Sequence, residues 1–166
     1  MMLKKFWKEL VFVILFTILL MTLSDYIPIN SSKEAIFSTQ TYVIGIIVLI
    51  LPIIPATIAG YLISKQSYHK THSLLIPGFG TAIGMIILLT ISFGQLYFLT
   101  DTQWQTEYQK VDELGINLFD NMSLNEFKDF TINSVLIAIP FITLLNFGFG
   151  VVGGLIGNYV YSKKNH

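Results

Sequence analysis

Four long apolar stretches dominate the chain, and short polar segments separate them. Each stretch reaches the roughly 20 residues that an α-helix needs to cross a bilayer core about 30 Å thick. Because an unpaired backbone group in lipid costs several kcal/mol, we expect these stretches to be helical despite their many β-branched residues. The predicted spans are residues 6–26, 42–64, 74–98 and 132–161.

The composition indicates an integral membrane protein rather than a soluble domain. Of the 166 residues, 53% are hydrophobic and only 12% are charged, whereas charged residues make up about a quarter of ordinary soluble chains. The absence of Cys excludes disulfides, thiol redox chemistry and thiolate zinc sites. Ten Lys balance ten acidic residues and there is no Arg, so we expect no nucleic-acid partner.

The charges between the spans predict how the chain is oriented. Residues 1–9, 64–73 and 162–166 together hold seven Lys and one acidic residue. Residues 25–40 and 101–130 hold nine acidic residues and three Lys. Since the basic side of a membrane protein stays in the cytoplasm, both termini are predicted to be cytoplasmic.

The first span also fits a second interpretation, a cleavable secretory signal. Three Lys precede the apolar run 10–23, and Thr22-Leu23-Ser24 resembles a cleavage site. However, Phe6 and Trp7 lengthen the apolar segment, and Thr is a mediocre substitute for Ala at the outer position of the site. An uncleaved membrane anchor is therefore the favoured interpretation.

Residues 99–131 form the largest segment predicted to lie outside the membrane. Trp104, Tyr108, Val111 and Leu114 recur at spacings of four, three and three, which predicts an apolar stripe on a short helix. The segment lacks the basic face of helices that bind anionic lipid, so we expect this helix to dock onto its own bundle. Its carboxylates lack the spacing of a calcium loop, and we expect no metal there.

A helix start follows the outer segment. Ser123 and Glu126 have the spacing of a capping box, in which the Ser side chain bonds an amide of the first turn and the Glu side chain returns to the amide of the Ser. The fourth helix is therefore predicted to begin near Ser123, outside the membrane.

Small residues predict where the helices approach one another. Lipid provides no hydrophobic drive between helices, so glycines that allow close backbone contact are the main packing signal. The favoured interpretation is that these faces pack against one another in a compact monomeric bundle. The alternative is that one of them docks a second copy or another membrane protein. The glycines concerned are Gly60, Gly80, Gly84, Gly150, Gly153, Gly154 and Gly157.

Ionisable residues are missing from the middle of all four spans. Transporters and membrane enzymes usually carry such residues there, because they are costly and retained for ion paths or catalysis. Gln95 and Asn146 are the notable neutral polar residues. We interpret them as residues that hold helices together by hydrogen bonds rather than as a cation or substrate site. No catalytic residue and no cofactor is predicted.

The ends of the second and fourth spans are alike. Residues 60–65 and 158–163 share Tyr, Ser and Lys at the same spacing. This similarity is consistent with two copies of a two-helix unit. Coincidence explains it nearly as well, because Tyr and Lys are expected at cytoplasmic helix ends.

A resemblance to a known group rests on three motifs. Ala59-Gly60-Tyr61-Leu62, the pair Gly80 and Gly84, and Gly153-Gly154-Leu155-Ile156-Gly157-Asn158-Tyr159 resemble the small, glycine-rich, four-span membrane proteins of unknown function found in prokaryotes. The resemblance covers about half of the chain and supplies no catalytic residues.

These observations predict an all-α bundle of four transmembrane helices with an amphipathic helix outside the membrane, between the third and fourth spans. The whole chain, residues 1–166, is expected to be one domain in a prokaryotic cell membrane. The predicted function is that of a non-catalytic accessory or interaction subunit that contacts itself or another membrane protein. The alternative is a small channel or transporter for a neutral solute or a monovalent cation.

Overall fold

The computed structural model describes residues 5–24, 50–66, 69–113 and 122–164. These ranges contain five α-helices and no strand, which confirms the all-α fold class. The helices are α2 (Trp7–Ser24), α5 (Ile53–Gln66), α6 (Lys70–Tyr97), α7 (Asp101–Glu113) and α8 (Leu124–Lys164).

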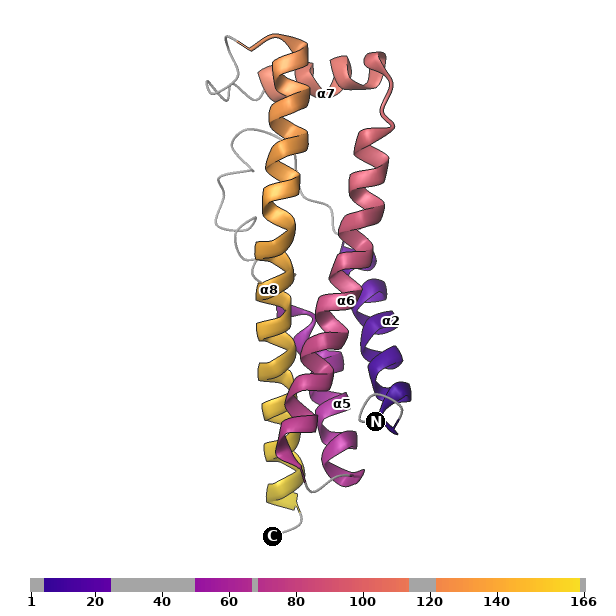
Figure 1. Ribbon diagram of the computed structural model, residues 1–166, viewed down its shortest axis with the longest axis vertical. Helices are drawn as coiled ribbons and strands as arrows, with labels where there is room; N and C mark the ends of the chain where they lie inside the picture. Colours follow the sequence, from indigo (N-terminus) through magenta and orange to yellow (C-terminus); the bar gives the residue numbers. More distant parts are fainter. Residues whose placement is uncertain (1–4, 25–49, 67–68, 114–121, 165–166) are drawn as a thin grey trace.

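The long helices run along one axis, and α7 crosses it at one end (Figure 1). α8 contacts both α5 and α6, while α2 lies against α6 on the other side. The beginning of α2 and the end of α8 lie at the same end of the molecule, together with the end of α5 and the beginning of α6. α7 lies at the opposite end from the beginning of α2 and the end of α8.

Within the described ranges, α6 and α8 are long and apolar enough to cross a membrane. α6 has 28 residues and contains nearly all of the predicted span 74–98, and α8 has 41 residues and contains the predicted span 132–161. α2 covers most of the first predicted span. α5 covers the end of the second, whose residues 42–49 lie outside the described part of the chain.

The capping box at the beginning of α8 is confirmed. The backbone amide and the hydroxyl of Ser123 both donate to the Glu126 carboxylate, each over 2.7 Å, and the Glu126 amide returns to the Ser123 hydroxyl over 3.4 Å. These bonds favour the ionised carboxylate and lower the pKa of Glu126. Because α8 begins here, a helix about 60 Å long extends well beyond a 30 Å bilayer core.

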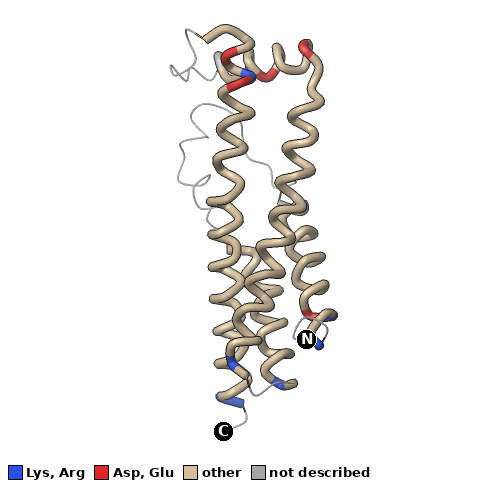
Figure 2. The backbone as a smooth tube through the Cα atoms, viewed as in Figure 1, with Lys and Arg blue, Asp and Glu red and all other residues tan. Residues whose placement is uncertain are grey.

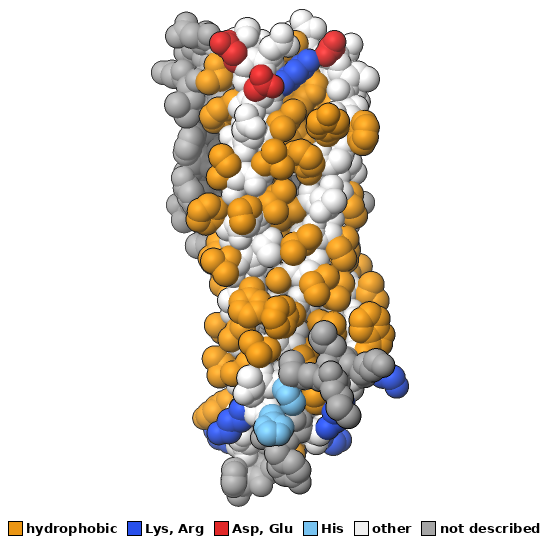
Figure 3. All heavy atoms as spheres, viewed as in Figure 1, with side chains coloured by type: hydrophobic (Ala, Val, Ile, Leu, Met, Phe, Trp, Pro, Cys, Tyr) orange, Lys and Arg blue, Asp and Glu red, His pale blue; other side chains and the backbone are white. Residues whose placement is uncertain are grey.

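Charged residues gather at the two ends of the long axis, and the helices between them carry none (Figure 2). Lysines dominate the end where α2 begins and α8 ends. Carboxylates dominate the end with α7. Between the ends, large apolar side chains cover much of the outer surface (Figure 3). We call the two ends the basic end and the acidic end.

Candidate functional site

Two glycines of α8 lie against α6. A Cβ atom on Gly150 would stand 2.6 Å from the Pro77 carbonyl oxygen and would collide with the Thr81 hydroxyl. A Cβ atom on Gly154 would collide with the Ser73 carbonyl oxygen. Because real Cβ atoms do not come this close, only glycine allows α8 and α6 to approach this closely.

Two further glycines of α8 lie against α5. A Cβ atom on Gly153 would stand 2.7 Å from the Ile53 carbonyl oxygen, and one on Gly157 would collide with the Thr57 carbonyl oxygen. From the other side, a Cβ atom on Gly60 of α5 would stand 2.7 Å from the Cα atom of Gly154. The glycines of α8 thus serve two neighbouring helices at once.

The glycines of α6 lie against α2. A Cβ atom on Gly80 would stand 2.7 Å from a methyl group of Val13, and one on Gly84 would stand 3.1 Å from the Ile14 carbonyl oxygen. All seven glycines singled out from the sequence therefore lie at contacts between helices of this one chain. Gly148 differs from them, because a Cβ atom there would meet none of the described residues within 4 Å.

Asn146 lies inside the bundle, with only 1% of its surface exposed. Its backbone carbonyl accepts a 2.7 Å hydrogen bond from the Thr81 hydroxyl of α6, and its Nδ2 atom donates to the Ile142 carbonyl over 2.9 Å. Within the part of the chain that the structure describes, its Oδ1 atom has no hydrogen-bond partner. Asn146 therefore joins α8 to α6 through its backbone and retains one unused acceptor.

Gln95 is not part of this polar contact. It lies on α6, fourteen residues beyond Thr81, which is about 21 Å along a helix. Its side chain is exposed, whereas that of Asn146 is buried. The structure therefore does not bring Gln95 and Asn146 into one site.

At the acidic end, α7 docks onto the beginning of α8. Trp104 is 4% exposed, and both Trp104 and Tyr108 pack edge-to-face on Phe127, with ring centroids 6.2 and 5.2 Å away. The Tyr108 hydroxyl also donates to the Met122 carbonyl over 2.8 Å. The predicted stripe thus faces the bundle at these two residues, while Leu114 lies outside the described residues.

An ion pair also joins α7 to α8. The Lys128 ammonium group lies 2.6 Å from the Asp101 carboxylate. This hydrogen bond and the positive charge of Lys128 favour the ionised carboxylate and lower the pKa of Asp101 below its usual 3.8. Since the folded pKa is the lower one, the ion pair contributes stability above pH 3.8 and loses it as the pH falls through the folded pKa.

The pKa of Asp101 provides a direct test of this contact. In a carboxyl-carbon NMR titration, we expect the Asp101 midpoint to lie below 3.8 in the native chain and to return toward 3.8 in Lys128→Met. An Asp101 midpoint that does not respond to loss of Lys128 would contradict the ion pair.

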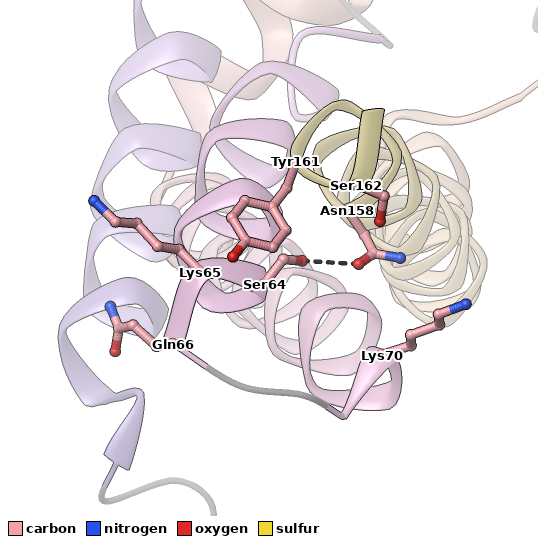
Figure 4. A pocket seen from close by; sticks show the side chains of 7 residues that line it. All are labelled: Ser64, Lys65, Gln66, Lys70, Asn158, Tyr161 and Ser162. Carbon is pink, nitrogen blue, oxygen red and sulfur yellow. Dashed lines mark hydrogen bonds between the residues drawn. The ribbon is translucent and has the colours of Figure 1, made fainter. Parts of the chain in front are cut away.

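A cavity of about 360 Å³ opens at the basic end, between the ends of α5 and α8 and the first residue of α6 (Figure 4). Across it, the Ser64 hydroxyl and the Asn158 Oδ1 atom are 3.0 Å apart. Beside it, Tyr61 and Tyr161 pack edge-to-face with centroids 5.8 Å apart. The lining residues are Ser64, Lys65, Gln66, Lys70, Asn158, Tyr161 and Ser162.

This cavity could not be predicted from the sequence pattern alone. The available signal is the Tyr, Ser and Lys spacing shared by residues 60–65 and 158–163, because these two segments supply most of its lining. Comparisons with protein-family models, curated proteins and solved structures found no significant match to this chain. The resemblance to small glycine-rich membrane proteins therefore stays an expectation from the sequence.

Proposed function

We propose that this chain is a non-catalytic accessory or interaction subunit of a prokaryotic cell membrane, with four spans and both termini in the cytoplasm. The charge distribution supports this orientation, because the basic end collects the lysines near both ends of the chain. The two helices that are apolar and long enough to cross a membrane, α6 and α8, support the membrane location.

We propose that one face of α8 contacts a partner protein. Ile137, Phe141 and Leu144 are 65–68% exposed and recur at spacings of four and three. Gly148 follows four residues later, and no described residue lies within 4 Å of the position of its missing Cβ atom. Large apolar side chains beside an accessible glycine form a groove into which the side-chain ridge of another helix can pack. We therefore place a membrane-spanning helix of a partner, rather than the glycines already in contact within this chain, on the face 137–148.

Site-directed cross-linking tests this face, because the chain contains no Cys and one introduced thiol is unique. We expect a photoreactive maleimide on Phe141→Cys to give a protein adduct in native membranes. The same probe on Leu15→Cys, an exposed position of α2, should not. The adduct should be lost when Gly148→Leu fills the open space. Equal labelling at both cysteines, or an adduct indifferent to Gly148→Leu, would contradict the proposal.

A second candidate function is supported by one observation, the unused Oδ1 acceptor of buried Asn146. A small channel or transporter for a neutral solute or monovalent cation would use such an oxygen inside the bundle. Liposome flux that is lost in Asn146→Leu but kept in Gln95→Leu would favour this function over the first. Gln95 is a suitable control because it lies about 21 Å from the level of Asn146 along the helix.

A further inference from the structure

The cavity at the basic end brings together three helix ends from distant parts of the chain. Ser64, Lys65 and Gln66 come from the end of α5, Lys70 begins α6, and the remaining residues come from the end of α8. Figure 4 shows Lys65 and Lys70 on opposite sides of the cavity, with Ser64, Asn158 and Tyr161 between them. A volume of about 360 Å³ falls within the usual size range of small-molecule pockets.

The lining chemistry suits an anion that accepts hydrogen bonds. It consists of two lysines, three hydroxyl groups and two side-chain amides, with no carboxylate. The nearby carboxylate of Glu9 is not part of the lining. It is buried and accepts a 2.7 Å hydrogen bond from the Gln66 amide. The long side chains of Lys65 and Lys70 are exposed and can swing their ammonium groups toward a bound anion.

The helix ends add their own partial charges. α6 begins at Lys70, and His69 before it provides no side-chain cap, so the first amides of α6 present positive partial charge. The ends of α5 and α8 present negative partial charge, about half an elementary charge each, which the two full charges of Lys65 and Lys70 in the lining outweigh. The balance at the cavity is therefore positive.

The position of the cavity indicates where the anion comes from. Large exposed apolar side chains, including Leu62 of α5 and Val160 of α8, lie within one turn of the lining residues. In Figure 3 the apolar surface gives way to lysines at this end of the molecule. In a membrane, the phosphate groups of lipids lie at this boundary, and basic pockets between helices bind them on the cytoplasmic side.

We propose that this cavity binds a phosphate group, supplied by the headgroup of an anionic phospholipid and held by Lys65 and Lys70. The hydroxyl groups of Tyr161 and Ser162 and the amide of Asn158 line the space that the phosphate oxygens occupy, while the Ser64 hydroxyl donates to the Gly60 carbonyl over 2.7 Å. This site rests on the membrane location in the proposed function. It does not depend on the partner face of α8.

Native mass spectrometry of the full chain from nanodiscs tests the site. The probe is a nanodisc of phosphatidylcholine with one-fifth phosphatidylglycerol. We expect the native chain to retain phosphatidylglycerol in preference to phosphatidylcholine. In Lys65→Gln/Lys70→Gln this preference should fall roughly thirty-fold, because each lysine contributes about fivefold. The matched control is Lys163→Gln/Lys164→Gln, which removes the same charge from the same end without touching the lining and should retain the lipid.

The outcomes separate the sources of the phosphate. Thermal stabilisation of the delipidated chain by inorganic phosphate, lost in Lys65→Gln/Lys70→Gln, would identify free phosphate as the ligand of the same site. Equal loss of lipid in both double variants would show attraction by overall charge only and overturn the proposal, as would no loss in either. Failure of the chain to remain in alkali-washed membranes would instead refute the proposed function.

Discussion

Gly154→Ala is expected to lower the free energy of unfolding by about 3 kcal/mol or more, at the upper end of the usual effects of overpacking. The added methyl group would collide with the Ser73 carbonyl oxygen of α6, and Gly60 of α5 approaches the same residue from another side. Two backbones limit the space at once, and backbone atoms cannot move away by a change of rotamer. α8 would therefore have to separate from α6, from α5 or from both.

Gly148→Ala is the matched control. It makes the same chemical change in the same helix, but its methyl group would enter open space. Its free energy of unfolding should stay unchanged or rise slightly, since Ala favours helix more than Gly does. Unfolding in bicelles by titration with a denaturing detergent, followed by circular dichroism, measures both variants. Equal stability of the two would refute the interhelical contact at Gly154.

This contrast changes which glycine should be used to look for a partner. From the sequence, Gly154→Leu is a natural choice for disrupting a complex, because Gly154 belongs to the densest group of small residues. The structure places Gly154 between helices of its own chain, so this substitution would damage the bundle itself. Gly148 is the position where a large side chain would leave the described bundle intact, so a substitution there tests the proposed partner face alone.

The sequence predicts the helices well where a local rule is sufficient. The capping box at Ser123 depends on residues three apart, and its bonds form as expected. The stripe of Trp104 and Tyr108 depends on the helical repeat, and both rings face the bundle. Such rules need no knowledge of which other helix lies nearby.

The choice of neighbour could not be predicted from the same pattern. At 100° per residue, Gly150 and Gly153 of α8 differ in direction by only about 60°, so they belong to one small-residue sector. Yet Gly150 faces α6, and Gly153 faces α5. Likewise, Asn146 and Gln95 are similar amides in apolar helices, and only the register between α6 and α8 decides which one is buried. That register depends on contacts between residues such as Thr81 and Asn146, which are 65 positions apart.

Trp104→Ala is expected to release α7 from α8. The indole is buried against Phe127, and loss of a buried Trp side chain usually costs about 3–5 kcal/mol. Other attachments that the described residues show are the edge-to-face packing of Tyr108 on Phe127, the Tyr108 hydrogen bond to Met122 and the ion pair of Asp101 with Lys128. Tyr108 is only partly buried and the Asp101 carboxylate is exposed to water, so these contacts hold α7 more weakly than the buried indole does.

Amide hydrogen exchange of α7, measured by mass spectrometry, reports this release. Exchange over Asp101–Glu113 should accelerate by roughly two orders of magnitude in Trp104→Ala, since each 1.4 kcal/mol is a factor of ten. The conservative Trp104→Phe should keep most of the protection, because an aromatic ring still faces Phe127. Trp7→Ala removes the other tryptophan of the chain, which is 60% exposed, and should leave α7 unchanged. If α7 exchanged at the same rate in Trp104→Ala and Trp7→Ala, the docking of this helix through Trp104 would be refuted.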